Sequence, residues 1–561
     1  MRAVLLLNSG DAIASWQYEA LRAAVEKGLD IIEIAHCQDE PARRLWGKHF
    51  GYYAFALMSR RGMATLQATS VRPLIKPSAH EISFSCEQEG AGQRIPAGIA
   101  DGFRGADVVI NFGMDLLRNP DSLPVRHGVL SYHHGGPDQP KAGPAGFYEL
   151  EQGAEVQGVI VQRLSDTLDG GEILATAFAP VVPYSYGRTV QAALVASIPL
   201  LAKAIETLEA ETSNEPKTFR PDYHLPTNTR VARQVVTLTG RKARHLAYGL
   251  FREKRWQVGR LTVPLLTEGD VLLSSADIEP IEGPAGYSFV ADCFVSAGES
   301  VYCEALNPRS GKGEIARWQS GRWAFLDLGL RGGHASYPQP IEDGESVFLF
   351  PEIAAVSSPV LYRLDPDGVG VSERIEMKGL EDMRLLDGTL FNHEETWYLF
   401  AGKRGSANLL LELWVAPALT GPYRPHPSSP VCLDPRGSRM AGPIVKIDGQ
   451  LYRFGQDGTQ NYGGRVTVHR IEELTEETYE ESRCGTIQCS DSWGPHTVSN
   501  RGNETWIDFF QEETSALAGF RRFKGRYLSG GGHSVPAVPT PGLSARQVSS
   551  PTLWSAPTDG S

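Results

Sequence analysis

The chain has 561 residues and a formal net charge of −12, from 54 Lys and Arg against 66 Asp and Glu. This length allows roughly two to four domains, each with its own core. The acidic balance argues against nucleic acid as the main partner, because phosphate binding requires a basic surface. The sequence has no run of about 18 apolar residues, so we expect no membrane span. Its seven cysteines are scattered without a C-x-x-C pair, which predicts reduced thiols in a cytoplasmic protein and no metal site.

The first part of the chain alternates between strand and helix patterns. Residues 2–8 and 29–35 read as buried strands, and residues 16–26 between them have helical periodicity. Further strands are expected at 108–112, 129–133 and 156–164, and a helix at 189–208. This β-α-β order predicts a parallel sheet in an α/β domain spanning residues 1–210. No G-x-G-x-x-G follows the first strand, so a dinucleotide site is not expected.

Residues 211–255 connect this domain to the rest of the chain. A polar, proline-containing stretch is the expected linker, and the basic helix-forming segment 229–255 follows it. We interpret the basic segment as a solvated helix face; an anionic-ligand or membrane-surface patch is the alternative.

From residue 256 the pattern changes to short β-type runs bounded by Gly, Asp, Pro and Asn. A turn followed by an aromatic strand recurs about every 45 to 55 residues, which is typical of four-stranded propeller blades. Residues 256–530 are therefore expected to form a five-bladed β-propeller, with a β-sandwich as the alternative. The Pro/Ser/Thr-rich tail, residues 531–561, is expected to be disordered.

The candidate chemistry of the first domain lies at the end of a strand. Ser131, His133 and His134 enter a Gly/Pro loop, and Asp169 follows in an acidic turn. A histidine oriented by a carboxylate can transfer protons. The alternative is that both histidines are polar loop residues and that Asp169 belongs to an ordinary turn.

In these segments the chain resembles the formyltransferase family that uses 10-formyltetrahydrofolate, which includes methionyl-tRNA and amino-sugar formyltransferases. The matching segments are residues 109–117, 128–133, 141–146 and 169–173. The resemblance implies a Rossmann-like domain in which His133 accepts a proton from an attacking amine and Asp169 orients the imidazole. It also implies that the formyl donor binds at Phe112, Gly113, Met114, Leu116 and Asp169.

One position departs from the pattern of that family. Its catalytic Asn corresponds to Ser131, so Ser131 or His134 would have to donate to the developing oxyanion. A hydroxyl donor is aimed less rigidly than an amide, which puts the activity, but not the fold, in question.

The second half resembles the five-bladed propeller of glycoside hydrolases and of the N-terminal region of glucosamine inositolphosphorylceramide transferase-like proteins. The segments that carry this resemblance include residues 291–294, 350–352, 397–400, 439–443 and 494–497. Such propellers hold carboxylates around a central pocket, and the candidates here are Asp292, Glu352, Asp387 and Asp457. A carboxylate pair can cleave glycosides, although many Asp residues simply cap turns.

Together these features predict an α/β plus all-β protein that transfers a formyl group from 10-formyltetrahydrofolate to a primary amine. The acceptor would be a small-molecule or sugar-linked amine, with the propeller holding the carbohydrate. The alternative is a propeller glycosidase, glycosyltransferase or carbohydrate-binding protein with an inactive formyltransferase-like domain. The sequence leaves the oligomeric state open.

Overall fold

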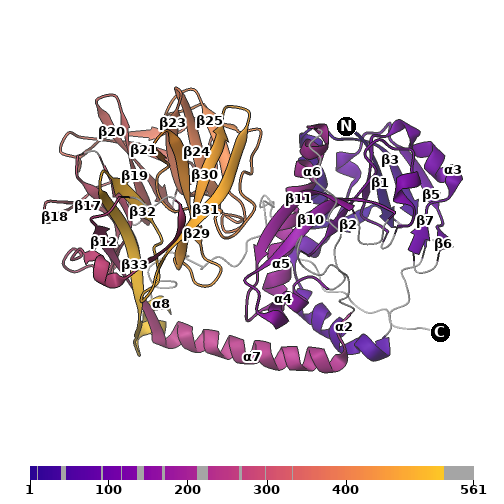
Figure 1. Ribbon diagram of the computed structural model, residues 1–561, viewed down its shortest axis with the longest axis horizontal. Coiled ribbons are helices and arrows are strands. Elements are labelled where there is room, and N and C mark those ends of the chain that lie inside the picture. The colour runs from indigo at the N-terminus through magenta and orange to yellow at the C-terminus, as the bar shows by residue number, and fades with distance from the viewer. Residues whose placement is uncertain are drawn as a thin grey trace, which may run out of the picture.

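A single long helix, α7 (Asn228–Phe251), connects an α/β part to a ring of five β-sheets (Figure 1). The computed structural model describes residues 1–523 except 9, 40–45, 90–91, 115–116, 136–143, 167–170, 211–224, 265–267, 297, 331–332 and 355. Most of the expected linker, residues 211–224 of 211–228, and the expected disordered tail therefore lie outside the described residues.

The α/β part is built on a seven-stranded sheet in the order β11-β10-β9-β8-β1-β3-β5. Strands β9, β8, β1, β3 and β5 run parallel, as the β-α-β pattern predicts. The expectation of an entirely parallel sheet is wrong, because β10 pairs antiparallel with both β9 and β11. After β9 the chain re-enters the sheet at the edge where β9 ends, and β10 then forms a hairpin with β11, so neither connection crosses over the sheet.

The bounds of the elements in this part are β1 (Arg2–Asn8), β2 (Ala12–Ala14), α1 (Ser15–Glu26), β3 (Asp30–Cys37), α2 (Trp46–Arg60), β4 (Ala68–Ser70), β5 (His80–Phe84), β6 (Glu87–Glu89), β7 (Gly92–Arg94), α3 (Ala97–Ala100), β8 (Val108–Asn111), β9 (Val129–His133), α4 (Phe147–Gln152), β10 (Val156–Leu164), β11 (Gly171–Pro180), α5 (Tyr186–Ser197) and α6 (Leu200–Glu209).

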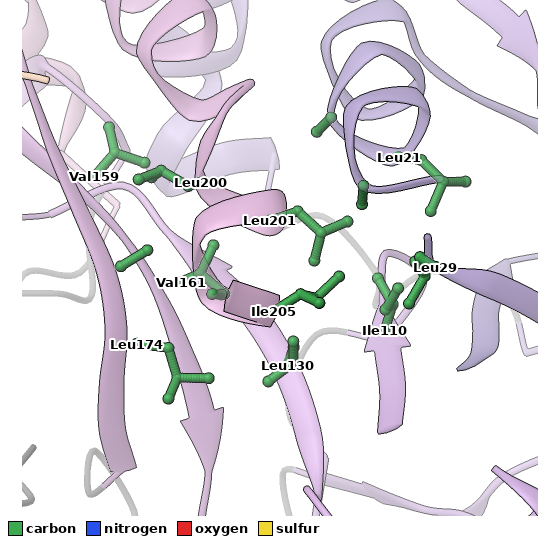
Figure 2. Packing of buried hydrophobic residues seen from close by; sticks show 14 of the residues in the cluster. Leu21, Leu29, Ile110, Leu130, Val159, Val161, Leu174, Leu200, Leu201 and Ile205 are labelled. Atoms are coloured by element: carbon green, nitrogen blue, oxygen red, sulfur yellow. The ribbon is translucent and has the colours of Figure 1, made fainter. Parts of the chain in front are cut away.

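Both faces of this sheet are buried, because successive side chains of a strand point to opposite sides. In β1, Leu5 and Leu7 join one cluster, whereas Val4 and Leu6 join another on the opposite face. Figure 2 shows the first cluster, in which side chains from α1 and α6 pack onto β8, β9, β10 and β11.

The helix predicted at 189–208 is two helices, α5 and α6, with Pro199 between them. Among the described residues, the stretch Tyr186–Glu209 is long and apolar enough to cross a membrane by length and composition. However, 78% of its most apolar window is buried inside the structure, where these helices cover the sheet.

The second part confirms the predicted five-bladed propeller. Its sheets follow one another along the chain as β15 to β18, β19 to β22, β23 to β26, and β27 to β31 with β13, and a fifth sheet contains β14, β12, β33 and β32. Apolar side chains fill the spaces between neighbouring blades, for example Tyr302 and Ile315 against Leu349 and Tyr362.

The bounds of the elements in this part are β12 (Arg252–Leu261), β13 (Gly269–Leu273), β14 (Glu279–Pro280), β15 (Val290–Val295), β16 (Val301–Asn307), β17 (Lys312–Gln319), β18 (Arg322–Phe325), β19 (Ala335–Asp343), β20 (Ser346–Ile353), β21 (Val360–Leu364), β22 (Val371–Glu376), β23 (Leu385–His393), β24 (Thr396–Lys403), β25 (Glu412–Ala416), β26 (Arg424–Pro425), β27 (Arg439–Met440), β28 (Val445–Ile447), β29 (Gln450–Asp457), β30 (Arg465–Leu474), β31 (Tyr479–Cys489), β32 (Val498–Arg501), β33 (Glu504–Thr514) and the short helix α8 (Ala518–Phe523).

The ring is closed by strands from both ends of the propeller sequence. Strand β12 pairs antiparallel with β33 along its whole length, from Arg252 opposite Thr514 to Leu261 opposite Thr505. The fifth blade is thus complete only when the first and last long strands meet, and no open edge is left between them.

One end of the ring packs against the α/β part. This end is formed by the loops after β24, β26 and β29. Strands β24 and β29 are the second strands of their blades and β26 is a fourth strand, and in an antiparallel blade these strands run in the same direction and end on the same side. Residues 409–410 join the apolar core of the α/β sheet, and the Phe178 N–H donates to the Leu433 carbonyl at 2.8 Å. Glu155 pairs with Arg465 at 2.9 Å.

Candidate functional site

In the α/β part, the carboxyl ends of the parallel strands β8 and β9 lie side by side. The Asn111 amide fixes the loop after β8 by donating to the Met114 carbonyl and accepting from the Met114 N–H at 2.8 Å. A Cβ at Gly113 would lie 2.3 Å from backbone atoms of Leu7 and Asn8, so only glycine fits there. Ser131 pairs in register with Asn111, at the centre of the sheet edge.

The two histidines have different surroundings. The Gln162 amide donates to His133 Nε2 at 2.9 Å, since an amide nitrogen can only donate. His134 Nε2 lies 3.2 Å from the Ser197 hydroxyl, and burial together with Arg60 lowers the pKa of His134 to about 4. His134 is therefore neutral near pH 7.

The predicted cofactor-binding residues are divided between the core and the undescribed loops. Phe112 packs edge-on against Trp16 and also contacts Tyr132, and Met114 is buried in the second apolar cluster of the sheet. Leu116 and Asp169 lie outside the described residues. Phe112 and Met114 thus serve the packing of this domain.

In the propeller, three successive inner strands share one irregularity. Strands β15, β19 and β23 each shift register at the same place, and the residue at each shift has a positive φ: Asp292 (52°), Tyr337 (47°) and Asp387 (49°). Non-glycine residues rarely adopt this conformation, and strained residues held by their surroundings cluster at functional sites. The repeated bulge thus places three buried polar residues at equivalent positions of three inner strands.

Asp292 belongs to a buried triad that closes the ring between the first and fifth blades. Nδ1 of His496 lies 3.1 Å from an Asp292 oxygen and 3.3 Å from an Asp508 oxygen. Asp508, which is fully buried, also accepts the backbone N–H of Asp292 at 2.9 Å and of His496 at 3.0 Å. On the outer side, the Tyr462 hydroxyl lies 3.1 Å from His496 Nε2, and 48% of Tyr462 is exposed.

Electrostatics fix the charge states of this triad. Burial alone would raise the pKa of Asp292, but the hydrogen bond and charge of His496 lower it below its usual value. Burial would lower the pKa of His496, but Tyr462, Asp292 and Asp508 hold it well above 6.5. An imidazolium between carboxylates is therefore the state at neutral pH.

Asp387 forms the second half of the axial cluster. Its carboxylate accepts from the Arg439 guanidinium and, at 3.2 Å, from the Gln456 amide, and its backbone N–H donates to Glu352 at 3.0 Å. Burial raises the pKa of Asp387 although Arg439 opposes the shift. Burial and the neighbouring Asp387 charge raise the pKa of Glu352 to about 8. Glu352 is therefore protonated at pH 7, and it lies beside the ion pair of Asp387 and Arg439.

We name the residues of these two halves the axial centre: Asp292, His496, Asp508, Tyr462, Asp387, Arg439, Glu352 and Gln456. It brings together three of the four predicted pocket residues. Asp457 lies elsewhere: it pairs with Arg465 at 2.8 Å and lines a separate cavity of about 680 Å³ between β29, β31 and β33. The reason is strand alternation, because Gln456 and Asp457 are neighbours in β29 and point to opposite sides. Gln460 and Gly464, from the loop that carries Tyr462, also line this cavity.

Sequence reasoning missed several members of the axial centre. His496 and Arg439 lie in segments that carried the propeller resemblance, but they were not assigned to the site. Asp508 could have been found from the sequence, because it is the only charged residue in the apolar segment Trp506–Phe510. A charge inside a buried strand requires a buried partner.

The triad also offers the ligands of a metal site. One ligand atom from each of Asp292, His496 and Asp508 lies within 4.8 Å of the others. Carboxylate and imidazole ligands suit several divalent ions, which would compete with the proton on His496.

Comparisons with known proteins place similarity in the propeller. Residues 271–501 match the family described as glucosamine inositolphosphorylceramide transferase 1, N-terminal. The chain is 31% identical over 216 residues to glucosamine inositolphosphorylceramide transferase 1 of Oryza sativa subsp. japonica, which covers 36% of this chain and 29% of that protein. The relative of the same name from Arabidopsis thaliana is 30% identical over 208 residues, with 35% and 27% covered. The chain thus matches less than a third of the length of these curated relatives.

Solved structures with similarity include an exo-β-1,3-galactanase from Clostridium thermocellum, at 12% identity, TM-score 0.29, and coverage of 39% of this chain and 57% of that one. The GH43_1 enzyme from Xanthomonas citri is 13% identical with the same TM-score, over 41% of this chain and 82% of the other. Similarity this weak supports no statement about activity.

The relatives correct the predicted activity. They are named as glucosamine inositolphosphorylceramide transferases, which is a transferase of another kind, so the expectation of a formyltransferase is wrong. Binding of 10-formyltetrahydrofolate and the cytoplasmic location are untested and stay predictions. The propeller, from residue 271 to 501, is similar to the N-terminal region of glucosamine inositolphosphorylceramide transferase 1, as the sequence resemblance implied.

Proposed function

We propose that the propeller binds the sugar headgroup of a glycolipid at the axial centre and acts in glycosyl transfer on that headgroup. The observation that carries this proposal is the axial centre itself. Seven of its eight members, all except Asp508, belong to the segment similar to the named glycolipid transferases.

The chemistry of the centre suits a headgroup that combines hydroxyl, amine and phosphate groups. Asp292 and Asp387 can accept hydrogen bonds from sugar hydroxyls or an ammonium group, and such charge-assisted bonds are the stronger ones. Arg439 can pair with a phosphate. Arg439 also lies under the ring of Tyr462, 5.4 Å from its centroid, and this partly exposed ring marks the open end of the cluster.

The experiment that tests this proposal measures headgroup binding by calorimetry with glucosamine, inositol 1-phosphate and a glucosaminyl inositol phosphate. We expect the combined headgroup to bind more tightly than either part. Asp387→Asn should weaken binding by about 10-fold to 100-fold, because a hydrogen bond to a charged group contributes roughly 1.5–3 kcal/mol.

The chain offers a closely matched control for this variant. Asp448 has the same φ of 49° and lies exposed in the turn between β28 and β29, so Asp448→Asn makes the same change outside the site. It should leave binding unchanged. Equal losses in both variants, or no binding of any headgroup by the unmodified protein, would refute the proposal.

A second candidate function, glycoside hydrolysis, is favoured by one observation. The pKa of Asp292 is lowered while that of Glu352 is raised to about 8, which separates a base from an acid at neutral pH. If the protein hydrolyses chromogenic glycosides, activity should fall above pH 8 as Glu352 ionises, and Glu352→Gln should abolish it. Transfer without hydrolysis would exclude this candidate.

A further inference from the structure

Helix α7 has an exposed apolar face that the fold does not use. The helix spans about 36 Å at 1.5 Å per residue and bridges the two parts of the molecule along one side (Figure 1). From Lys242 to Ala247 every residue is exposed.

The buried and the most exposed residues of α7 lie on different sides of the helix. Val231 and Leu238, together with Gln234, are buried against the protein. Val236 and Leu250 are 73% and 54% exposed, and they lie 14 positions apart, which is almost four turns and therefore the same face. Leu246, one turn before Leu250, is 58% exposed. An amphipathic helix needs one apolar face for packing, and the described part of the chain leaves most of this second face exposed.

Positive charge surrounds this face. Helices α2, α7 and α8 together carry nine Lys and Arg and no Asp or Glu, although the chain as a whole has a net charge of −12. Within the described part of the chain, Arg233, Lys242 and Arg244 form no ion pair. At 100° per residue, Arg233 and Arg244 flank the face on one side and Lys242 on the other.

The helices next to the two ends of α7, α2 and α8, also carry exposed apolar side chains and basic residues. Near its start, the Gly51 N–H of α2 donates to Asn228 at 2.7 Å, and α2 exposes Leu57 and Met58. Near its end, Gly519 of α8 lies against Leu250, and α8 exposes Phe520.

We propose that α7, together with α2 and α8, is a membrane-docking surface that lies on an anionic phospholipid bilayer. Leucine and valine side chains would enter the boundary between headgroups and acyl chains, while the flanking Arg and Lys contact lipid phosphates. A second copy of the chain is a poorer occupant, because self-association through this face would bring the two sets of cations together. Acidic groups at the end of α7 are already paired, Glu253 with Arg521 and Glu513 with Arg255.

This surface is separate from the axial centre and does not depend on the proposed function. If both hold, docking through α7 would keep the propeller beside a lipid whose headgroup it binds.

Vesicle co-sedimentation of the full chain tests the surface. We expect binding to phosphatidylcholine vesicles that contain phosphatidylglycerol and much weaker binding to pure phosphatidylcholine. Replacing Arg233, Lys242 and Arg244 together with Gln should weaken binding about 100-fold, at about a factor of five per cation near an anionic surface. Replacing Val236, Leu246 and Leu250 with Ser should weaken it on vesicles of either composition.

The control removes three exposed cations of the propeller, Arg309, Arg404 and Lys446, by substitution with Gln. This variant keeps the same net charge as the α7 variant and should bind vesicles like the unmodified protein. Equal losses in both charge variants, or no binding of the unmodified protein, would overturn the proposal. The proposal would also be overturned if the unmodified protein were a dimer that binds no vesicles and if the Ser substitutions converted it to a monomer. The exposed face of α7 would then be an interface between two copies of the chain.

Asp387→Asn separates the two proposals. That variant should lose headgroup binding yet sediment with anionic vesicles normally, so either proposal can fail without the other. Thermal unfolding of each variant checks that the substituted α7 still folds.

Discussion

Replacing His496 with Gln should destabilise the propeller far more than a surface histidine replacement. The imidazolium is buried between Asp292 and Asp508, at 3.1 Å and 3.3 Å. Without it, two interior carboxylates face each other with no cation between them. Removing one partner of a buried ion pair costs about 3 to 5 kcal/mol. Urea unfolding followed by tryptophan fluorescence measures this, because seven of the ten tryptophans lie between residues 256 and 506.

The pH dependence of this loss is a second, independent test. The raised pKa of His496 contributes stability that is complete below pH 6.5 and disappears as pH rises through its folded value. The lowered pKa of Asp292 contributes stability above pH 3.8 that disappears as pH falls through its folded value. The stability difference between the unmodified protein and the variant should therefore be largest between about pH 3.8 and pH 6.5 and shrink in alkali.

A suitable control is His393→Gln, which breaks a 4.0 Å surface pair with Glu394 and should cost less than about 1 kcal/mol. The reasoning is refuted if the two histidine variants lose similar stability at pH 6. It is also refuted if the loss caused by His496→Gln does not change with pH.

Three further changes test other parts of the structure. Gly113→Ala should destabilise the α/β part by about 1–3 kcal/mol in chemical unfolding, because the new Cβ would lie 2.3 Å from backbone atoms. Gly240→Ala is the control: the space around Gly240 in α7 is open, so this change should stabilise the protein by about 1 kcal/mol. Arg453→Met should lower the free energy of unfolding by about 3 to 5 kcal/mol, since it leaves the carboxylate of Glu481 buried without its guanidinium; a change below 1 kcal/mol would contradict this. Cys37 and Cys86, with sulfurs 2.9 Å apart, should form a disulfide under a mild oxidant, seen as the loss of two titratable thiols. Because this disulfide would close a loop of 49 positions, it should raise the free energy of unfolding by about 4 kcal/mol. Unchanged thiol titration would exclude the pair.

The sequence predicted those elements whose pattern is local. Strand β1 has a buried apolar run and was predicted with its observed bounds. The long helix-forming stretch without proline predicted α7, but the helix ends at Phe251, and residues 252–255, which were included in the predicted helix, begin β12. The direction of β10 depends on whether the chain crosses over the sheet after β9 or re-enters it at the same edge, and packing rather than a local pattern decides this. Pro199 in the sequence indicates a break in the helix predicted at 189–208, because proline lacks the backbone N–H that the helix interior requires.

The axial centre was predicted only in part, because its members are brought together by ring closure. Asp292 and Asp508 lie 216 positions apart in the chain and meet only when the first and fifth blades adjoin. No local spacing encodes such a meeting. Asp457 was misplaced for a simpler reason: neighbouring residues of a strand face opposite sides, and the sequence alone did not tell which of Gln456 and Asp457 faces the axis.

The pairing of β12 with β33 has a practical consequence for dividing this protein. Sequence similarity begins at residue 271, but a recombinant fragment cut there would lack β12 and expose the edge of β33, a strand of eleven residues. Exposed edges of this length promote aggregation. A fragment that starts at residue 252 should be soluble. Because α7 runs directly into β12, a pulling force on the α/β part would act first on the strand that closes the ring.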